Sequence, residues 1–208
     1  MSRRLYRSPA RKAAADETRA RIVAAASALL GTTRDRRSFS LQAVAKQAGV
    51  TRLTVYKQFG SRRALLEAVF DELATRRGFR DLAKVMEDPD PHRALWRIVS
   101  FFCDFWSSGT RALLRLHSAG ASDPDLDESV RERNERRRRM LSVLVRRMAK
   151  GRRRDCKPPR DLVDVLFALT SLFFFAQLQT GTRSSKAACR LVQAACEDAV
   201  RRAGLGPD

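Results

Sequence analysis

The segment of residues 39–59, FSLQAVAKQAGVTRLTVYKQF, permits one kind of local fold, two short helices joined at a glycine. The spacing predicts a first helix over 41–48, because apolar residues recur there at i, i+3, i+4 and i+7. These residues are Leu41, Val44, Ala45 and Ala48. Ser40 is placed to cap this helix, and Gly49 to end it with a positive φ. Thr51 can then cap a second helix, which completes a helix-turn-helix.

The second helix has little apolar surface to bury. Val50, Val55 and Phe59 can pack inward, and the outer face of its first turns remains polar apart from Leu53 and Tyr56. A helix-turn-helix lowers such turns into the major groove of DNA. The predicted DNA-binding residues are Ser40, Gln42, Thr51, Arg52, Leu53, Thr54, Tyr56, Lys57 and Arg62.

These residues divide by role. We expect base edges to be met by Arg52, Leu53, Thr54 and Lys57. We expect the side chains of Tyr56 and Arg62 to bind phosphates of the DNA backbone. The hydroxyls or helix-end amides of Ser40 and Thr51 are expected to bind phosphates as well. The site binds DNA and carries no chemistry.

The order of residues over 18–73 resembles the tetracycline-repressor (TetR) family of bacterial regulators. TRARIVAAASALL, residues 18–30, looks like the first helix of that family, with Ile22, Val23, Ala26, Leu29 and Leu30 as its buried stripe. FGSRRALLEAVFDELA, residues 59–74, resembles its fourth helix, with Ser61 as N-cap. Leu53 departs from the pattern, because a small residue is common there, and its bulk favours contact with a thymine methyl group.

The resemblance implies an all-α protein. An N-terminal three-helix helix-turn-helix domain would bind DNA, and a C-terminal helical domain would bind a ligand and form the dimer. We expect a basic flexible arm over 1–17, the DNA-binding domain over 18–66, and the effector-binding and dimerisation domain over 67–208. The Arg-rich loop 31–38 departs from the family, which usually has a short turn there.

Charge supports a nucleic-acid partner. Residues 1–66 hold 15 Lys and Arg against 3 Asp and Glu, whereas residues 67–208 hold 27 against 20, so most of the net +19 lies in the first third of the chain. Such a field attracts a polyanion without selecting a sequence. Biased codon usage is an alternative source of the arginine excess, but it does not explain this asymmetry.

Residues 1–17 contain basic side chains and no apolar run long enough for a signal peptide. Two interpretations stay open for this arm, namely contact with phosphates or the minor groove, and a plain solvated terminus.

The remainder of the chain reads as helical, because no segment alternates with period two. Turn signals such as Asp88-Pro89-Asp90-Pro91 and Ser107-Ser108-Gly109 separate pieces of helical length. The expected helices cover 91–108, 110–121, 125–150, 160–179 and 184–203. The charged run 131–139 is interpreted as a solvated helix face, with DNA or an acidic ligand as the alternative partner.

Residues 165–182 are uncharged and approach the length of a membrane span, but polar residues interrupt them. A helix that is apolar nearly all round must be buried. The resemblance implies burial against a second subunit, and burial inside one subunit is the alternative. The predicted dimer contacts are Leu166, Leu169, Phe173, Phe174 and Gln177.

The helix over 91–108 has the densest aromatic content, and Leu95, Val99, Phe102 and Trp106 share one face. A solid core is one interpretation. A cavity for an apolar or aromatic effector is the other, and it is the one that the resemblance implies. The predicted ligand-binding residues are Phe102, Phe105, Trp106, His117, Met140 and Leu144.

The four cysteines, Cys103, Cys156, Cys189 and Cys196, lack the paired spacing and nearby histidines of a zinc site, so we expect no metal and no cofactor. They fit a reducing cytoplasm, and a redox role would rest on Cys156. Nucleophile-elbow, phosphate-loop, dinucleotide and HExxH motifs are absent, so no enzyme is predicted.

These patterns predict a dimeric transcriptional regulator that responds to a ligand, most simply a repressor released from a palindromic operator by a small apolar or aromatic effector. The alternative is a basic nucleoid-type structural protein with little sequence preference. The second domain argues against it, because a DNA-coating protein needs no aromatic-lined helical domain.

Overall fold

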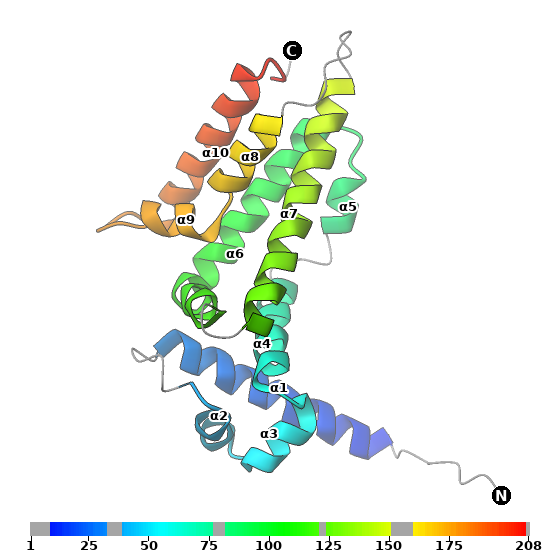
Figure 1. Cartoon of the computed structure of the whole chain (residues 1–208), viewed down its shortest axis with the longest axis vertical. Coiled ribbons are helices and arrows are strands. Elements are labelled where there is room, and N and C mark those ends of the chain that lie inside the picture. Colours follow the sequence, from blue (N-terminus) through cyan, green and yellow to red (C-terminus); the bar gives the residue numbers. More distant parts are fainter. Residues whose placement is uncertain (1–8, 33–38, 77–81, 121–123, 151–159, 207–208) are drawn as a thin grey trace, which may run out of the picture. The chain divides into compact units, whose positions relative to one another are not determined.

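The computed structural model describes residues 9–32, 39–76, 82–120, 124–150 and 160–206 (Figure 1). Within these ranges the chain forms helices and no strand, so the predicted all-α class is confirmed. The chain divides into two compact units, Met1–Glu72 and Leu73–Asp208. Each unit is described by itself.

The first unit contains α1 (Pro9–Thr32), α2 (Leu41–Ala48), α3 (Arg52–Phe59) and the larger part of α4 (Arg62–Arg76). α1 packs against α2, and α2 packs against α3. Its buried side chains come from all four helices, at the positions where the sequence places apolar residues at helical spacing. They include Ile22, Ala26, Leu30, Val44, Ala45, Val55, Phe59, Leu65, Leu66 and Val69.

α1 begins earlier than expected, because residues 9–17, which we assigned to a flexible arm, belong to the helix. Pro9 stands at the first helical position, where its missing N–H costs nothing, and the run of alanines at 13–15 has the highest helix propensity. This added length reaches α3, since the Gln58 side-chain amide donates to the Ala15 carbonyl at 3.5 Å. Residues 1–8 lie outside the described residues.

The second unit contains α5 (Leu82–Met86), α6 (Pro91–Gly120), α7 (Pro124–Lys150), α8 (Arg160–Leu169), α9 (Leu172–Leu178) and α10 (Ser185–Arg202). α6 packs against α5, α7, α9 and α10, and α8 lies beside α7 and α10 (Figure 1). α5 was not predicted. Fully buried side chains fill the space between these helices: Leu95, Ile98, Leu141, Leu144, Leu166 and Phe175.

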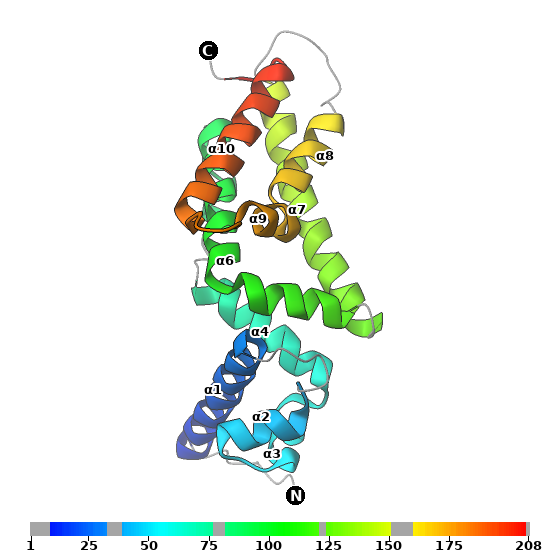
Figure 2. The same ribbon diagram turned by 90° about the vertical axis from the view of Figure 1, so that its left-hand side faces the viewer.

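The expected helices 91–108 and 110–121 are the two limbs of α6. They meet at Gly109, whose φ of −157° and ψ of 24° are not helical. Figure 2 shows the resulting bend, with the limb that follows Gly109 running across the direction of the first. The turn signal at Ser107-Ser108-Gly109 therefore corresponds to a kink within α6 and not to a loop between two helices.

The expected single helix over 160–179 is broken between α8 and α9. Ser171 leaves the helical conformation and caps α9, because its hydroxyl oxygen accepts from the Phe174 N–H at 3.2 Å. Serine favours such caps over helix interiors. In the described part of the chain, no single helix is long and apolar enough to cross a bilayer. The pair α8–α9 passes that test by length and composition, but it is bent by 53°.

Candidate nucleic-acid interface and effector region

The turn between α2 and α3 is formed by local hydrogen bonds. The Ser40 hydroxyl oxygen accepts from the Ala43 N–H at 3.1 Å and caps α2. Gly49 ends α2 in the left-handed region, with φ 65° and ψ 36°, where only glycine is unstrained. The Thr51 hydroxyl oxygen then accepts from the Thr54 N–H at 3.1 Å and caps α3. These contacts are those of the predicted helix-turn-helix.

α3 has a buried face and an exposed face. Val55 and Phe59 are buried against the rest of the unit. The opposite face presents Arg52, Leu53, Tyr56 and Lys57, and the exposed fractions of Leu53 and Tyr56 are 60% and 57%. α3 therefore presents large side chains to solvent on the face opposite its buried residues.

The other predicted DNA-binding residues surround this face. Ser40, Gln42 and Thr51 are exposed. Thr54 is half-buried and its hydroxyl lies 2.9 Å from that of Thr51, so it supports the helix start. Arg62 is half-buried, and its guanidinium lies over the Phe39 ring at 5.6 Å.

Arg19 was missed by the sequence analysis. It donates to the Gln58 carbonyl at 3.2 Å, and its guanidinium lies over the Phe59 ring at 4.3 Å. This contact fixes the C-terminal end of α3 on α1. No local pattern identifies Arg19, because its partners lie about forty residues away in the chain.

The predicted effector residues on the first limb of α6 form a packed aromatic cluster. Phe102, Phe105 and Trp106 are buried, and the ring centroids of Phe105 and Trp106 lie 4.8 Å apart. The Trp106 indole N–H donates to the Thr170 carbonyl at 2.9 Å. Leu144 is fully buried and Met140 half-buried on α7.

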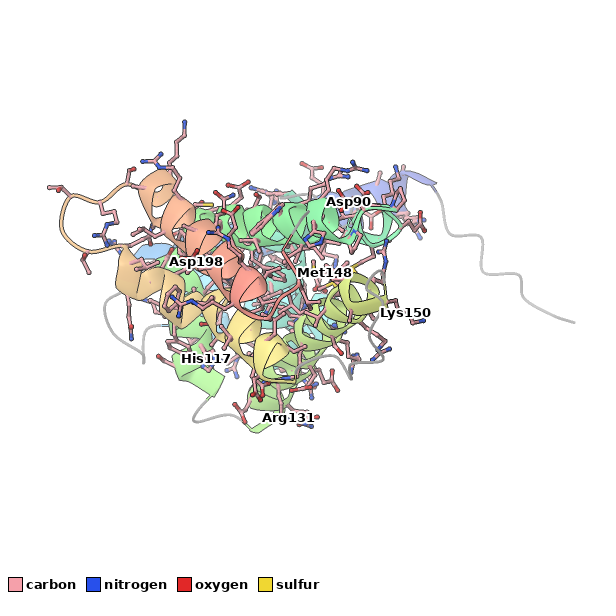
Figure 3. The ribbon with its side chains drawn as sticks, turned by 90° about the horizontal axis from the view of Figure 1, so that it is seen from above. Asp90, His117, Arg131, Met148, Lys150 and Asp198 are labelled. Carbon is pink, nitrogen blue, oxygen red and sulfur yellow. The ribbon has the colours of Figure 1, made fainter. Side chains whose placement is uncertain are left out.

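The structure does not gather all of the predicted cavity residues. His117 lies on the second limb of α6, where its ring contacts that of Phe173 at 4.7 Å. Figure 3 shows His117 well away from Met148, which lies near the C-terminal end of α7. The kink at Gly109 is the physical reason, because it turns the second limb of α6 in a different direction.

A narrow gap lies beside the aromatic cluster. It is lined by Val99, Phe102, Cys103, Trp106, Leu169, Thr170, Phe175 and Val192, and it is too small for a water molecule. Of the predicted ligand-binding residues, Phe102 and Trp106 line this gap. The aromatic face of α6 is therefore packed in this structure.

The residues predicted to form the dimer contact differ in how deeply they are buried. Leu166 is fully buried inside the second unit and so cannot touch another subunit, which corrects its assignment. Leu169 is half-buried at the gap, and Phe174 is also half-buried. Gln177 is exposed, and Phe173 has an exposed fraction of 49%. The apolar run alone could not show which face of the helix its neighbours cover.

The outward face of α8 carries Asp161, Asp164, Val165 and Ala168, at i, i+3, i+4 and i+7. On the neighbouring α10, Leu191 and Ala194 are exposed. Val165 and Leu191 each have an exposed fraction of 44%. Val165, Ala168, Leu191 and Ala194 are thus exposed apolar residues on two adjacent helices, beside the carboxylates of Asp161 and Asp164.

The described cysteines are free thiols. Burial raises the pKa of Cys196 to about 12 and raises that of Cys103 further, so neither forms a thiolate readily. Cys156 lies outside the described residues. In the described ranges no group of three or more His, Cys, Asp or Glu side chains is placed to hold a metal ion.

Residues 22–69 match the family model of the bacterial regulatory proteins of the tetR family, and this segment covers α2, α3 and parts of α1 and α4. This segment is therefore a helix-turn-helix domain of the TetR type. No curated protein sequence matches the chain significantly.

Solved structures share the fold of this chain over most of its length. A TetR-family transcriptional regulator from Mesorhizobium loti is 16% identical with a TM-score of 0.65, and the match covers 90% of this chain and 97% of that one. A second, from Rhodococcus, is 18% identical with a TM-score of 0.65 over 88% and 98%. NalD, the secondary repressor of the MexAB-OprM multidrug efflux pump in Pseudomonas aeruginosa, is 22% identical with a TM-score of 0.59 over 92% and 96%.

Proposed function

We propose that this protein is a TetR-family regulator, a dimeric repressor that binds a palindromic operator through α3 and leaves it when a small apolar effector binds the second unit. The observation that carries the proposal is the exposed face of α3, where the side chains of Arg52, Leu53, Tyr56 and Lys57 are open to solvent. The fold shared with NalD, which is a repressor, supports the direction of regulation.

In the proposed complex, α3 lies in the major groove. Arg52 and Lys57 donate to guanine or thymine acceptors, and Leu53 packs on a thymine methyl group. Tyr56 donates to a phosphate, and Arg62 contributes positive charge at the start of α4. The exposed amides and hydroxyls of Ser40 and Thr51 lie at helix starts, where phosphates are favoured.

The first experiment asks whether the protein selects a sequence. The full chain is incubated with a random pool of duplexes, and the bound DNA is sequenced. A repressor should enrich an inverted repeat, and its affinity for that site should exceed its affinity for a random duplex by about 10³-fold or more. A ratio near one would favour the nucleoid-type alternative.

The dimer is proposed to form through the outward faces of α8 and α10, because a two-fold axis is needed to read two half-sites. Val165→Asp places an unpaired carboxylate in this seam on both subunits, which costs several kcal/mol when it is desolvated. Sedimentation should show a monomer with helical circular dichroism and lost operator binding. Val143→Asp is the matched control, because Val143 is an exposed valine on α7 and belongs to neither α8 nor α10.

A Val165→Asp variant that remains dimeric and binds the operator as the parent does would move the seam elsewhere. The choice of Val165 avoids an ambiguity that Leu166 would bring. Leu166 is fully buried within the subunit, so a charge there would unfold the domain whatever the oligomeric state.

The effector is proposed to enter beside the first limb of α6, at the gap lined by Phe102, Trp106 and their neighbours. The gap is closed in this structure, so binding must separate its walls. A ligand that binds the widened form more tightly shifts the population toward that form. Release of DNA follows if the widened form has the lower operator affinity.

A further inference from the structure

Arg137 is a charged side chain in the core of the second unit. It lies on α7 with an exposed fraction of 4%. Its guanidinium lies over the ring of Phe167 at 4.3 Å and over that of Phe102 at 5.5 Å. It donates to the Thr170 carbonyl, and to the Asn134 side-chain oxygen at 3.4 Å.

Among the residues that the structure describes, no carboxylate balances the charge of Arg137. Its buried Nε–H also lacks a hydrogen-bond partner among these residues. The adjacent Arg138 adds a second positive charge, although that guanidinium pairs with Asp164. Burial, followed by the charge of Arg138, lowers the pKa of Arg137 to about 10, so the guanidinium stays protonated at neutral pH. A buried cation without a partner is costly.

A structural role explains only part of this arrangement. Thr170 follows the last residue of α8, and a cation is favourable at the C-terminal end of a helix. Trp106 donates to the same carbonyl, however, so this acceptor already has a partner without Arg137. The helix end therefore accounts for neither the unpartnered Nε–H nor the choice of a full charge.

The narrow gap described above lies next to Arg137. Phe102 and Thr170 line the gap, and both contact the guanidinium. Its other walls are apolar side chains of α6, α8, α9 and α10, such as Val99, Leu169 and Val192. A ligand in this place would meet apolar walls along its body, and the Arg137 guanidinium lies behind two of the lining residues, Phe102 and Thr170.

We propose that Arg137 binds the anionic group of the effector, and that the effector is an apolar monocarboxylate whose body occupies the widened gap. This inference rests on the proposed function, since it names the chemical class of the effector. A carboxylate accepts from the Nε–H and one terminal N–H of a guanidinium in a bidentate arrangement. That pairing would use the donor that now lacks a partner.

Trp106 reports on this site, because its indole N–H and Arg137 share the Thr170 carbonyl. Trp96 is the second tryptophan of the chain. The full-length Trp96→Phe variant therefore has a single tryptophan at the gap, and its fluorescence can be titrated.

The probes are acids and their matched primary amides: octanoate with octanamide, and 3-phenylpropionate with 3-phenylpropanamide. Each pair has the same apolar body and differs in charge. At least one acid should change the Trp106 emission saturably, with an affinity about tenfold or more above that of its amide, because a charged hydrogen bond to a guanidinium is lost. Equal affinity within each pair, or no saturable response to either acid, would overturn the inference.

The variants separate Arg137 from general charge. Arg137→Gln should abolish the preference for the acid, and Arg137→Lys should restore part of it. Arg139→Gln is the control, since Arg139 is exposed on the same helix and the charge change is identical. Persistence of the acid preference in Arg137→Gln would overturn the assignment. If that variant does not fold, the comparison of acid and amide on the Arg137-containing protein decides.

Operator release is measured separately on the selected duplex. An acid that binds at Trp106 and leaves the operator complex intact would contradict the proposed function but not the role of Arg137. Release by the neutral amides at the same concentrations as by the acids would keep the proposed function and overturn the role of Arg137.

Discussion

α3 and the first limb of α6 both carry large apolar or aromatic side chains, but α3 exposes them to solvent and α6 buries them. α3 leaves Leu53 and Tyr56 exposed on a short helix whose inner face is already filled by Val55 and Phe59. α6 buries Phe105 and Trp106, because α7, α9 and α10 cover it. The first surface is open to solvent, whereas the second is covered within the subunit. We propose that similar side chains serve recognition in one unit and stability in the other.

The largest effect is expected for a substitution in the buried aromatic face of α6. Phe105→Ala should lower the free energy of unfolding by about 3–5 kcal/mol, because the ring is buried and stacked with its neighbours. Urea denaturation followed by circular dichroism measures it. Tyr56→Ala is the exposed counterpart and should change stability by only about 0.5 kcal/mol. A mild Phe105→Ala variant would instead support the open cavity that the sequence analysis considered.

Arg52→Ala tests the exposed face of α3. The variant should fold as the parent does, since Arg52 is exposed, but it should lose about 1–3 kcal/mol of binding on the selected operator. Fluorescence anisotropy on the operator and on a random duplex separates the two kinds of binding. An equal loss on both would mean that Arg52 contacts the DNA backbone and reads no base.

The start of α3 gives a smaller effect. Thr51→Ala removes the hydroxyl oxygen that accepts from the Thr54 N–H, so the first unit should lose about 1 kcal/mol of stability. Operator affinity should fall with it, because the outward residues lie on the same turns. Thr51→Ser keeps the hydroxyl and should behave as the parent. If serine and alanine destabilise the unit equally, the cap does not contribute.

The smallest effect concerns Arg62, whose guanidinium lies over Phe39 and is only partly exposed. Arg62→Ala should reduce the slope of log affinity against log salt by about one unit, equally on operator and random DNA. Binding measured over a series of salt concentrations provides the slope. An unchanged slope would show that Arg62 does not contact a phosphate.

Predictions from the sequence were strongest where the contacts are local. Ser40, Gly49 and Thr51 act on residues only three or four positions away, so their caps and turn could be predicted from spacing. The start of α1 was missed, because a charged terminus hid the helix propensity of the alanines at 13–15. The break at Ser171 was missed because the uncharged run around it reads as one continuous apolar helix.

The sites of the second unit were predicted less well, and the reason is geometric. Leu166 and Val165 are neighbours in the sequence, and only the packing of α8 against α7 and α10 decides that the first is buried and the second exposed. His117 and Trp106 both lie on α6, but the bend at Gly109 separates their surroundings.

The sequence by itself determined the helix-turn-helix, its outward residues and the helical class of the whole chain. These follow from propensity, capping and periodicity, which act over a few residues. The tertiary structure alone decided that the arginine run of α7 includes one buried member, Arg137, and that Trp106 shares its acceptor. An arginine at any position of a helix looks the same in a sequence. Its burial depends on which distant helices pack over it, and that is a property of the folded chain.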